Sequence, residues 1–156
     1  MLDISHHLRY QFLHPLATIP ERSYEEAIGY DLHACLITES GNPSIAHILP
    51  WQTRAIPTGL KLLPPSGFYI GIYSRSGMAL HVPPVFVANA PGVVDPDYRG
   101  EIKVILYNGG KDLYTVRHGE RIAQAVLCPI QCVPLESAII NDVTARGDKG
   151  FGSTGR

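Results

Sequence analysis

The segment at residues 92–100, GVVDPDYRG, carries the side chains best suited to acid–base chemistry. Asp95 follows two valines, so its carboxylate is expected at the end of an apolar strand, where a positioned base could accept a proton. Residues 102–107, IKVILY, form the strongest strand candidate in the chain. The segment therefore predicts a β-hairpin arm with carboxylates near its bend. An ordinary Asp turn before Pro96 is the alternative reading of the same residues.

Two further segments are suited to binding phosphate. In SRSG, residues 74–77, a hydroxyl and an accessible amide lie beside the donor fork of Arg75. In RGDKGFGSTGR, residues 146–156, four glycines surround a phenylalanine, a serine and a threonine. Such a stretch exposes backbone amides that can wrap phosphate oxygens. It is not a P-loop, because the Gly-Lys-Ser/Thr order is absent. A simple turn and a flexible tail are the alternatives for the two segments.

Two polar residues interrupt apolar runs. Asp31 lies within AIGYDLHA, residues 27–34, and Gln124 lies within HGERIAQAVL, residues 118–127. A buried polar group needs a hydrogen-bond partner, so each position implies a specific contact, either structural or functional.

Composition limits the function classes. The 156 residues fit one domain, and 45% hydrophobic and 17% charged residues are typical of a globular protein. A formal net charge of −1 argues against bulk electrostatic binding of nucleic acid, although a local basic site for a small phosphate ligand is compatible with it. Three cysteines without repeated spacing predict neither a disulfide framework nor a zinc site.

The elements that must position these residues are short. Thirteen prolines and fifteen glycines divide the chain into segments too short for most helices. Apolar runs between them predict strands, and a short helical turn is expected after Ser76. The pattern predicts an all-β barrel or jelly-roll-like sandwich, with the first 20 or so residues and the last 12 or so as mobile ends. The strand candidates cover residues 60–63, 68–73, 82–88, 102–107, 121–127 and 138–143.

The chain has no apolar run long enough to cross a membrane and no signal-peptide pattern at its N-terminus. We therefore expect a cytoplasmic or nuclear protein that is not secreted and binds no membrane.

Five segments in this order resemble the motifs of the trimeric dUTPase family: AIGYDL, SRSGMA, GVVDPDYRGE, GERIAQ and RGDKGFGSTG. The resemblance implies a jelly-roll-like distorted β-barrel at residues 1–145 and a glycine-rich arm at 146–156. It further implies a homotrimer with shared active sites, in which the arm closes over a neighbour's site. The reaction implied is hydrolysis of dUTP to dUMP and diphosphate with Mg²⁺. This reaction limits uracil incorporation into DNA and supplies dUMP for thymidylate synthesis.

The family roles transfer residue by residue onto this sequence. By resemblance, Asp95 is the general base, and Asp31 lies near the water shell of Mg²⁺, which the triphosphate and waters hold without direct protein ligands. Tyr98 packs under the deoxyribose and excludes UTP, and Lys103 approaches the nucleotide. The residues expected to bind phosphates are Arg75, Ser76, Gly77, Gln124, Arg146, Gly152, Ser153 and Thr154. The residues expected to contact the base are Asn89, Phe151 and the backbone of Gly92, Val93, Val94 and Asp95.

Some positions depart from the common family pattern. Lys149 replaces a usual glycine of the fifth motif, Ile28 and the Tyr73-Ser74 pair differ from the commonest forms, and residues 40–51 look long.

Two other functions compete. A dCTP deaminase of the same superfamily needs a catalytic glutamate where this chain has Ile105, which cannot transfer protons. A non-catalytic jelly-roll module is the second alternative.

Overall fold

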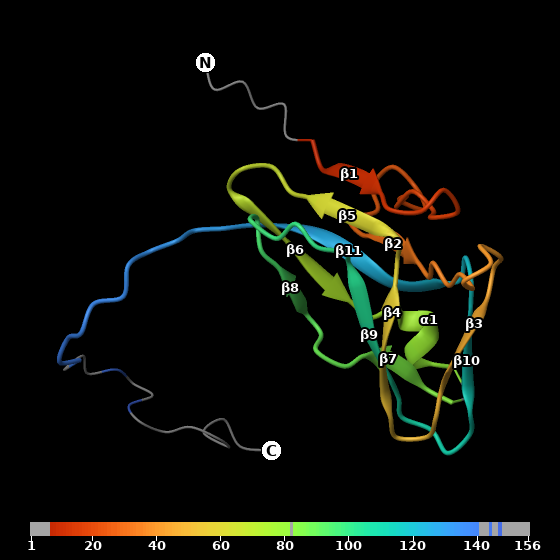
Figure 1. The fold of residues 1–156 in the computed structure, drawn as a ribbon. Coiled ribbons are helices and arrows are strands. Elements are labelled where there is room, and N and C mark those ends of the chain that lie inside the picture. The colour runs from red at the N-terminus through yellow and green to blue at the C-terminus, as the bar shows by residue number, and fades with distance from the viewer. Residues whose placement is uncertain (1–6, 82, 141–143, 145–146, 148–156) are drawn as a thin grey trace.

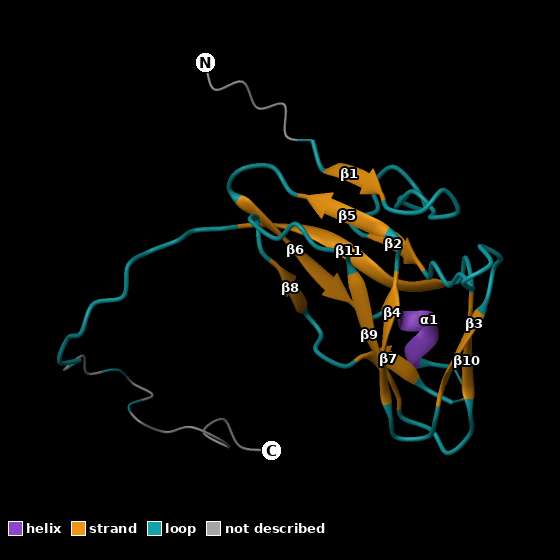
Figure 2. Cartoon of the chain, viewed as in Figure 1, coloured by secondary structure: helices purple, strands orange, loops and turns teal. Residues whose placement is uncertain are grey.

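The computed structural model describes residues 7–81, 83–140, 144 and 147. In this part of the chain the fold is almost entirely β (Figure 1, Figure 2). The eleven strands and one helix are β1 (Arg9–Phe12), β2 (Tyr30–His33), β3 (Ile45–Ile48), β4 (Thr53–Pro57), β5 (Leu60–Leu63), β6 (Phe68–Tyr73), α1 (Ser76–Ala79), β7 (Val85–Val87), β8 (Gly92–Val94), β9 (Lys103–Asn108), β10 (Tyr114–Arg117) and β11 (Arg121–Pro129).

The strands form four antiparallel sheets instead of one closed barrel. The largest has the order β2-β11-β6-β8, a second has the order β4-β9-β7, and the pairs β1-β5 and β10-β3 complete the set. The β1-β5 pair forms one end of the molecule, and the turns around β3, β4 and β10 form the other (Figure 1). The expected all-β fold is thus confirmed.

Alternation along the strands explains how they enclose a core. In β9, Val104 and Leu106 are buried, whereas Lys103 and Ile105 are exposed. This period of two places every second side chain against the facing sheet. The core formed in this way includes Leu32, Ile48, Ile56, Ile70, Val85, Val116 and Ile122.

A buried amide closes the far end of β9. Asn108 is completely buried, and its Nδ2 donates to the carbonyl oxygens of Ile48, at 2.9 Å, and of Asp112, at 2.8 Å. Its Oδ1 accepts from the backbone N–H of Gly110 at 3.0 Å. These bonds connect β9 with β3 and with the turn that leads into β10.

The short helix lies where the sequence predicts a helical turn. Arg75 has an extended backbone conformation immediately before it, and Met78 is its buried residue. The hydroxyl of Ser74 accepts a hydrogen bond from the N–H of Val87 at 2.9 Å, which ties the start of the helix to β7. The helix therefore presents Ser76 and Gly77 outward, and both are exposed.

Several strand predictions agree with the structure, and others need correction. The segments 60–63 and 68–73 match β5 and β6, and 82–88, 102–107 and 121–127 overlap β7, β9 and β11. The first 20 residues are not all a mobile end, because residues 9–12 pair with β5. Residues 138–140 form no strand and are exposed, and 141–143 lie outside the described residues.

Within the described residues, no helix is long and apolar enough to cross a membrane.

Candidate functional site

A group of polar side chains surrounds Asp31 on β2. Its side chain is only 6% exposed, and Oδ1 lies 3.0 Å from Nε of Arg75. Oδ2 lies 3.3 Å from Nη1 of Arg121 and 3.5 Å from the hydroxyl of Ser23, which donates to it. A nearly buried carboxylate thus holds two guanidinium groups on one side of the sheet. These charge-assisted hydrogen bonds are stronger than neutral ones and fix the arginine forks.

A β-bulge brings Arg121 into this group. The register between β11 and β2 pairs Arg121 with His33 and Gln124 with Asp31, with a shift between Arg121 and Ala123. Without the extra residue, positions 121 and 124 would point to opposite faces of the strand. The bulge re-aims one of them, so that both face the side of Asp31. Arg121 lies in the GERIAQ segment, but its role was missed because strict alternation gives no sign of a bulge.

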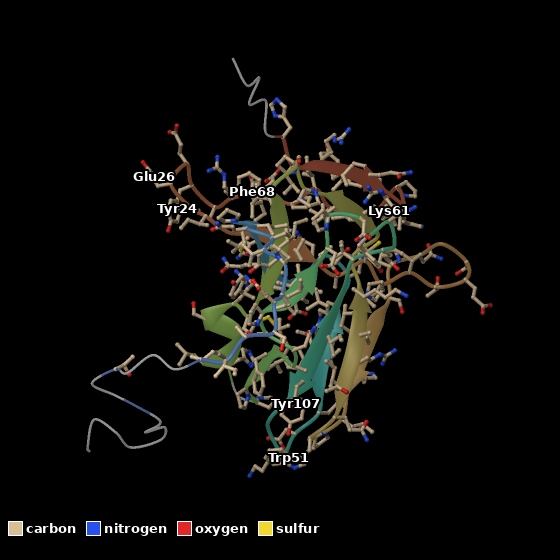
Figure 3. The ribbon with its side chains drawn as sticks, turned by 90° about the vertical axis from the view of Figure 1, so that its left-hand side faces the viewer. Tyr24, Glu26, Trp51, Lys61, Phe68 and Tyr107 are labelled. Atoms are coloured by element: carbon tan, nitrogen blue, oxygen red, sulfur yellow. The ribbon has the colours of Figure 1, made fainter. Side chains whose placement is uncertain are left out.

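Gln124 adjoins an open cavity of about 570 Å³. A Cβ atom added to Gly29 would lie 3.2 Å from both Cβ and Cδ of Gln124, so the absence of a side chain at position 29 makes room for this amide. The cavity is also bordered by Ser23, Tyr24, Glu26, Ile28 and Tyr73. Figure 3 shows Tyr24 and Glu26 projecting from the loop before β2.

The segment around Asp95 forms a second group. Asp95 is exposed in the turn after β8. A Cβ at Gly92 would lie 3.2 Å from Nδ2 of Asn89, so the Asn89 amide packs closely against this glycine. Val93, in the middle of the strand, is 61% exposed. The expected grouping of Asn89 with the start of the segment is present.

The two strands that flank Asp95 do not pair with each other, so the prediction of a β-hairpin is wrong. β8 pairs with β6, whereas β9 pairs with β4 and β7. The physical reason is that Ile102 is bonded elsewhere: its N–H donates to Leu60, and its carbonyl accepts from Thr58. As a result, β8 is an edge strand among the described strands, and its outer side pairs with none of them.

Tyr98 and Lys103 lie on either side of Glu101. The Tyr98 hydroxyl donates to the Glu101 carbonyl oxygen at 3.0 Å, which folds the ring back over Gly100. Nζ of Lys103 lies 3.7 Å from Oε2 of Glu101, and the lysine side chain is more than half exposed. Both residues therefore contact Glu101, six positions after Asp95.

Within one chain, the Asp95 turn and the Asp31 group lie apart. Val94 pairs with Ile70, so Asp95 lies level with Tyr69, whereas Gln124 pairs with Tyr73. Four residues of extended strand separate these levels by roughly 13 Å. No hydrogen bond or ion pair between described residues connects Asp95 with the Asp31 group.

Two ionisable groups, His33 and Tyr114, lie close enough to the charges of the Asp31 group to interact with them. Burial lowers the pKa of His33, and Nδ1 of this ring has no hydrogen-bond partner among the described residues. The Tyr114 hydroxyl donates to Oε1 of Glu120 at 2.5 Å, and burial raises the pKa of that tyrosine. Glu120 also accepts from the N–H of Arg117, which fixes the turn just before Arg121.

The remaining expected site residues lie outside the described residues: Arg146, Phe151, Gly152, Ser153 and Thr154. Within the described residues, no three His, Cys, Asp or Glu side chains are arranged to hold a metal ion.

Comparisons with known proteins agree on one family. The family model described as dUTPase matches residues 16–155. A deoxyuridine 5'-triphosphate nucleotidohydrolase from Picosynechococcus sp. is 42% identical over 151 residues, which cover 96% of this chain and 99% of that protein.

Solved structures share the fold. A mutant dUTPase of Staphylococcus bacteriophage 80alpha, solved with dUpNHpp, aligns with a TM-score of 0.83 and 24% identity over 96% of this chain and 99% of that one. A mutant dUTPase from phage phi11 of S. aureus, described as revealing the coordination of a structural Mg(II) ion, aligns with a TM-score of 0.74 and 19% identity, covering 86% of this chain and 98% of that one.

Proposed function

Because the chain belongs to the dUTPase family, we propose that it hydrolyses dUTP to dUMP and diphosphate by attack of water on the α-phosphorus. The observation that carries this proposal is the orientation of Arg75. Its Nε is bound to Asp31, and Nη1 reaches the Arg121 carbonyl only at 3.4 Å. The outer edge of the guanidinium is thus left for phosphate oxygens, beside the exposed Ser76 and Gly77.

Asp95 is the general base in this proposal. Its carboxylate is exposed at the end of β8, so a water molecule can reach it and lose a proton to it. Positioning of that water and neutralisation of the phosphate charge supply most of the acceleration. Arg121, which the sequence did not single out, adds a second cation to the phosphate side.

In this proposal, backbone groups along the open edge of β8 recognise the uracil base. Backbone N–H and C=O groups from Gly92 to Asp95 offer a fixed pattern of donors and acceptors, and the Asn89 amide adds another at the start of the strand. Cytosine carries a donor where uracil carries an acceptor, so a fixed backbone pattern discriminates between them. Tyr98 packs under the deoxyribose and leaves no space for a 2'-hydroxyl.

Other contacts complete the substrate site. Lys103 approaches the nucleotide, and Gln124 binds the phosphates from the cavity next to Gly29. In the arm that we assign to residues 146–156, Arg146 pairs with phosphate and Phe151 covers the base. Residues 152–154, Gly-Ser-Thr, wrap the γ-phosphate.

Mg²⁺ fits this site as an ion carried by the substrate. Both oxygens of Asp31 are already engaged by arginines, so this carboxylate suits a contact with metal-bound water better than direct ligation. When bound to the triphosphate, Mg²⁺ neutralises charge on the phosphate oxygens.

We further propose that copies of the chain share active sites in a homotrimer. The separation between Asp95 and the Asp31 group supports this, because one chain does not bring base and phosphate ligands together. The segment after β11 supports it too. Residues 131–140 extend away from the sheets (Figure 1), and Val133, Leu135, Ile139 and Ile140 are 69–102% exposed. Large apolar side chains that are exposed together along one segment are typical of a surface that binds a partner chain.

Diphosphate release from dUTP tests the activity, and Asp95→Asn tests the base. We expect this variant to lose turnover by about 10²–10⁴-fold, while it still binds the dUTP analogue dUpNHpp. Normal turnover by Asp95→Asn would remove Asp95 from the mechanism. Loss of analogue binding together with turnover would instead assign the residue to substrate binding.

Mixing two inactive variants tests the sharing of sites. Asp95→Asn and Arg75→Gln chains, unfolded together and refolded, would form mixed trimers in which some sites take an intact residue from each chain. We expect activity to return in the mixture and not in either variant refolded alone. A mixture as inactive as its components would show that Asp95 and Arg75 act from one chain.

A further inference from the structure

A small groove bordered by basic residues, called the basic groove below, lies between the β1-β5 pair and the turn after Asp95, and no residue of the Asp31 group lines it. Its volume is about 170 Å³. Arg9, Gln11, Lys61, Tyr98 and Arg99 border it together with Tyr10, Leu62 and Leu63, and most of the lining is apolar. Figure 3 shows Lys61 at this end of the molecule, opposite Trp51 and Tyr107.

The register of the strands places two of the cations together. Arg9 pairs with Leu63, and Gln11 pairs with Lys61, so Arg9 and Lys61 point to the same face of the pair. Arg99 reaches the groove from the turn on its other side. Three basic residues thus border one small space in a chain whose net charge is −1.

These charges are not neutralised within the chain. The ion pairs among described residues involve Arg75, Arg121 and Lys103, and none involves Arg9, Lys61 or Arg99. Like charges that converge without an acidic partner repel one another, and an anion between them removes that cost. Three basic residues without an ion pair at the border of the groove therefore favour an anion over a cation there.

Arg99 is also held in place before any ligand arrives. Its Nη1 donates to the carbonyl oxygens of Pro96, at 2.8 Å, and Tyr98, at 2.9 Å. The rest of its fork is left to bind phosphate with little further loss of side-chain freedom.

We propose that this groove is a second anion site that binds a phosphate or diphosphate group through Arg9, Lys61 and Arg99. The small volume favours an inorganic anion or the terminal phosphates of a larger molecule, because pockets for whole drug-sized ligands occupy about 300–1,000 Å³. Among the residues assigned to dUTP, only Tyr98 borders the groove, so the site is distinct from the proposed substrate site.

Calorimetric titration with sodium diphosphate tests this site, with Lys61→Gln as the probe variant. Lys111→Gln removes an exposed cation in the turn before β10 and serves as the matched control. Saturating dUpNHpp occupies the proposed substrate site during the titration. We expect salt-sensitive diphosphate binding that persists with dUpNHpp, that weakens at least tenfold in Lys61→Gln and that is unchanged in Lys111→Gln.

Equal weakening in both variants, or no diphosphate binding once dUpNHpp is present, would overturn the second site. Parallel titrations with inorganic phosphate and with ADP identify the source of the phosphate group. ADP that binds more tightly than diphosphate would assign the site to nucleotides, whereas equal or weaker binding would assign it to the inorganic anion. A failure of dUpNHpp to bind would count against the proposed function alone, since the comparison of Lys61→Gln with Lys111→Gln does not depend on it.

Discussion

Replacement of Asp31 by asparagine should lower both stability and activity, because one carboxylate orients two arginines. The amide keeps the shape of the side chain but loses the charge. The 3.0 Å bond to Arg75 is a hydrogen bond to a charged group at a nearly buried position, which contributes about 1.5–3 kcal/mol. The contact with Arg121 adds less than about 1 kcal/mol, since that side chain is 52% exposed and solvent screens it.

The loss is thus about 2–3 kcal/mol. For a domain of this length each kcal/mol lowers Tm by about 2–4 °C, so we expect a decrease of about 4–12 °C. Thermal unfolding followed by circular dichroism, at one fixed protein concentration, measures it. Asp112→Asn is the control, because the exposed Asp112 side chain makes no ion pair among the described residues and its replacement should change stability by about 0.5 kcal/mol at most. An unchanged Tm and unchanged kcat/KM for dUTP in Asp31→Asn would refute the positioning role.

Three further predictions follow from individual contacts. Asn108→Leu should cost about 3 kcal/mol, because it removes three hydrogen bonds of a buried side chain, one of them buried and two partly buried, and a urea midpoint equal to that of the exposed control Asn42→Leu would contradict this. The lowered pKa of His33 means that the unfolded chain binds this proton more readily, so stability should fall as the pH drops below about 6.5. Urea midpoints between pH 7.5 and 5 should depend less on pH in His33→Gln, and identical slopes would exclude this histidine as a source. Deletion of residues 146–156 should reduce turnover of dUTP by orders of magnitude while leaving Tm unchanged, and full activity of the shortened chain would exclude the arm from the site.

Local pattern predicted the strands well where apolar and β-branched residues form a run, as in β6 and β9. It did not predict that Gly92–Val94 and Lys103–Asn108 join different sheets, because pairing depends on which backbone groups Ile102 meets far along the chain. This difference matters for the proposed function: β8 pairs only with β6 among the described strands, so its other edge is open to the uracil, whereas pairing with β9 would have occupied that edge.

The candidate site residues, too, were predicted from local pattern only in part. Asp31 and Gln124 were recognised as polar interruptions of apolar runs, and the structure pairs them directly. Arg121 was missed because a β-bulge aims it, and the role of Gly29 was missed because only the packed structure shows the Gln124 side chain against it. The basic groove joins residues 9, 61 and 99, which no sequence motif connects.

The most direct test of the central claim is diphosphate release from a panel of dUTP, UTP, dTTP and dCTP. We predict release from dUTP far above that from the other three, with dUMP as the second product and no ammonia from dCTP. Equal hydrolysis of UTP would contradict the role of Tyr98, and ammonia from dCTP would favour the deaminase. Absence of diphosphate from dUTP with Mg²⁺ present would contradict the proposed function itself.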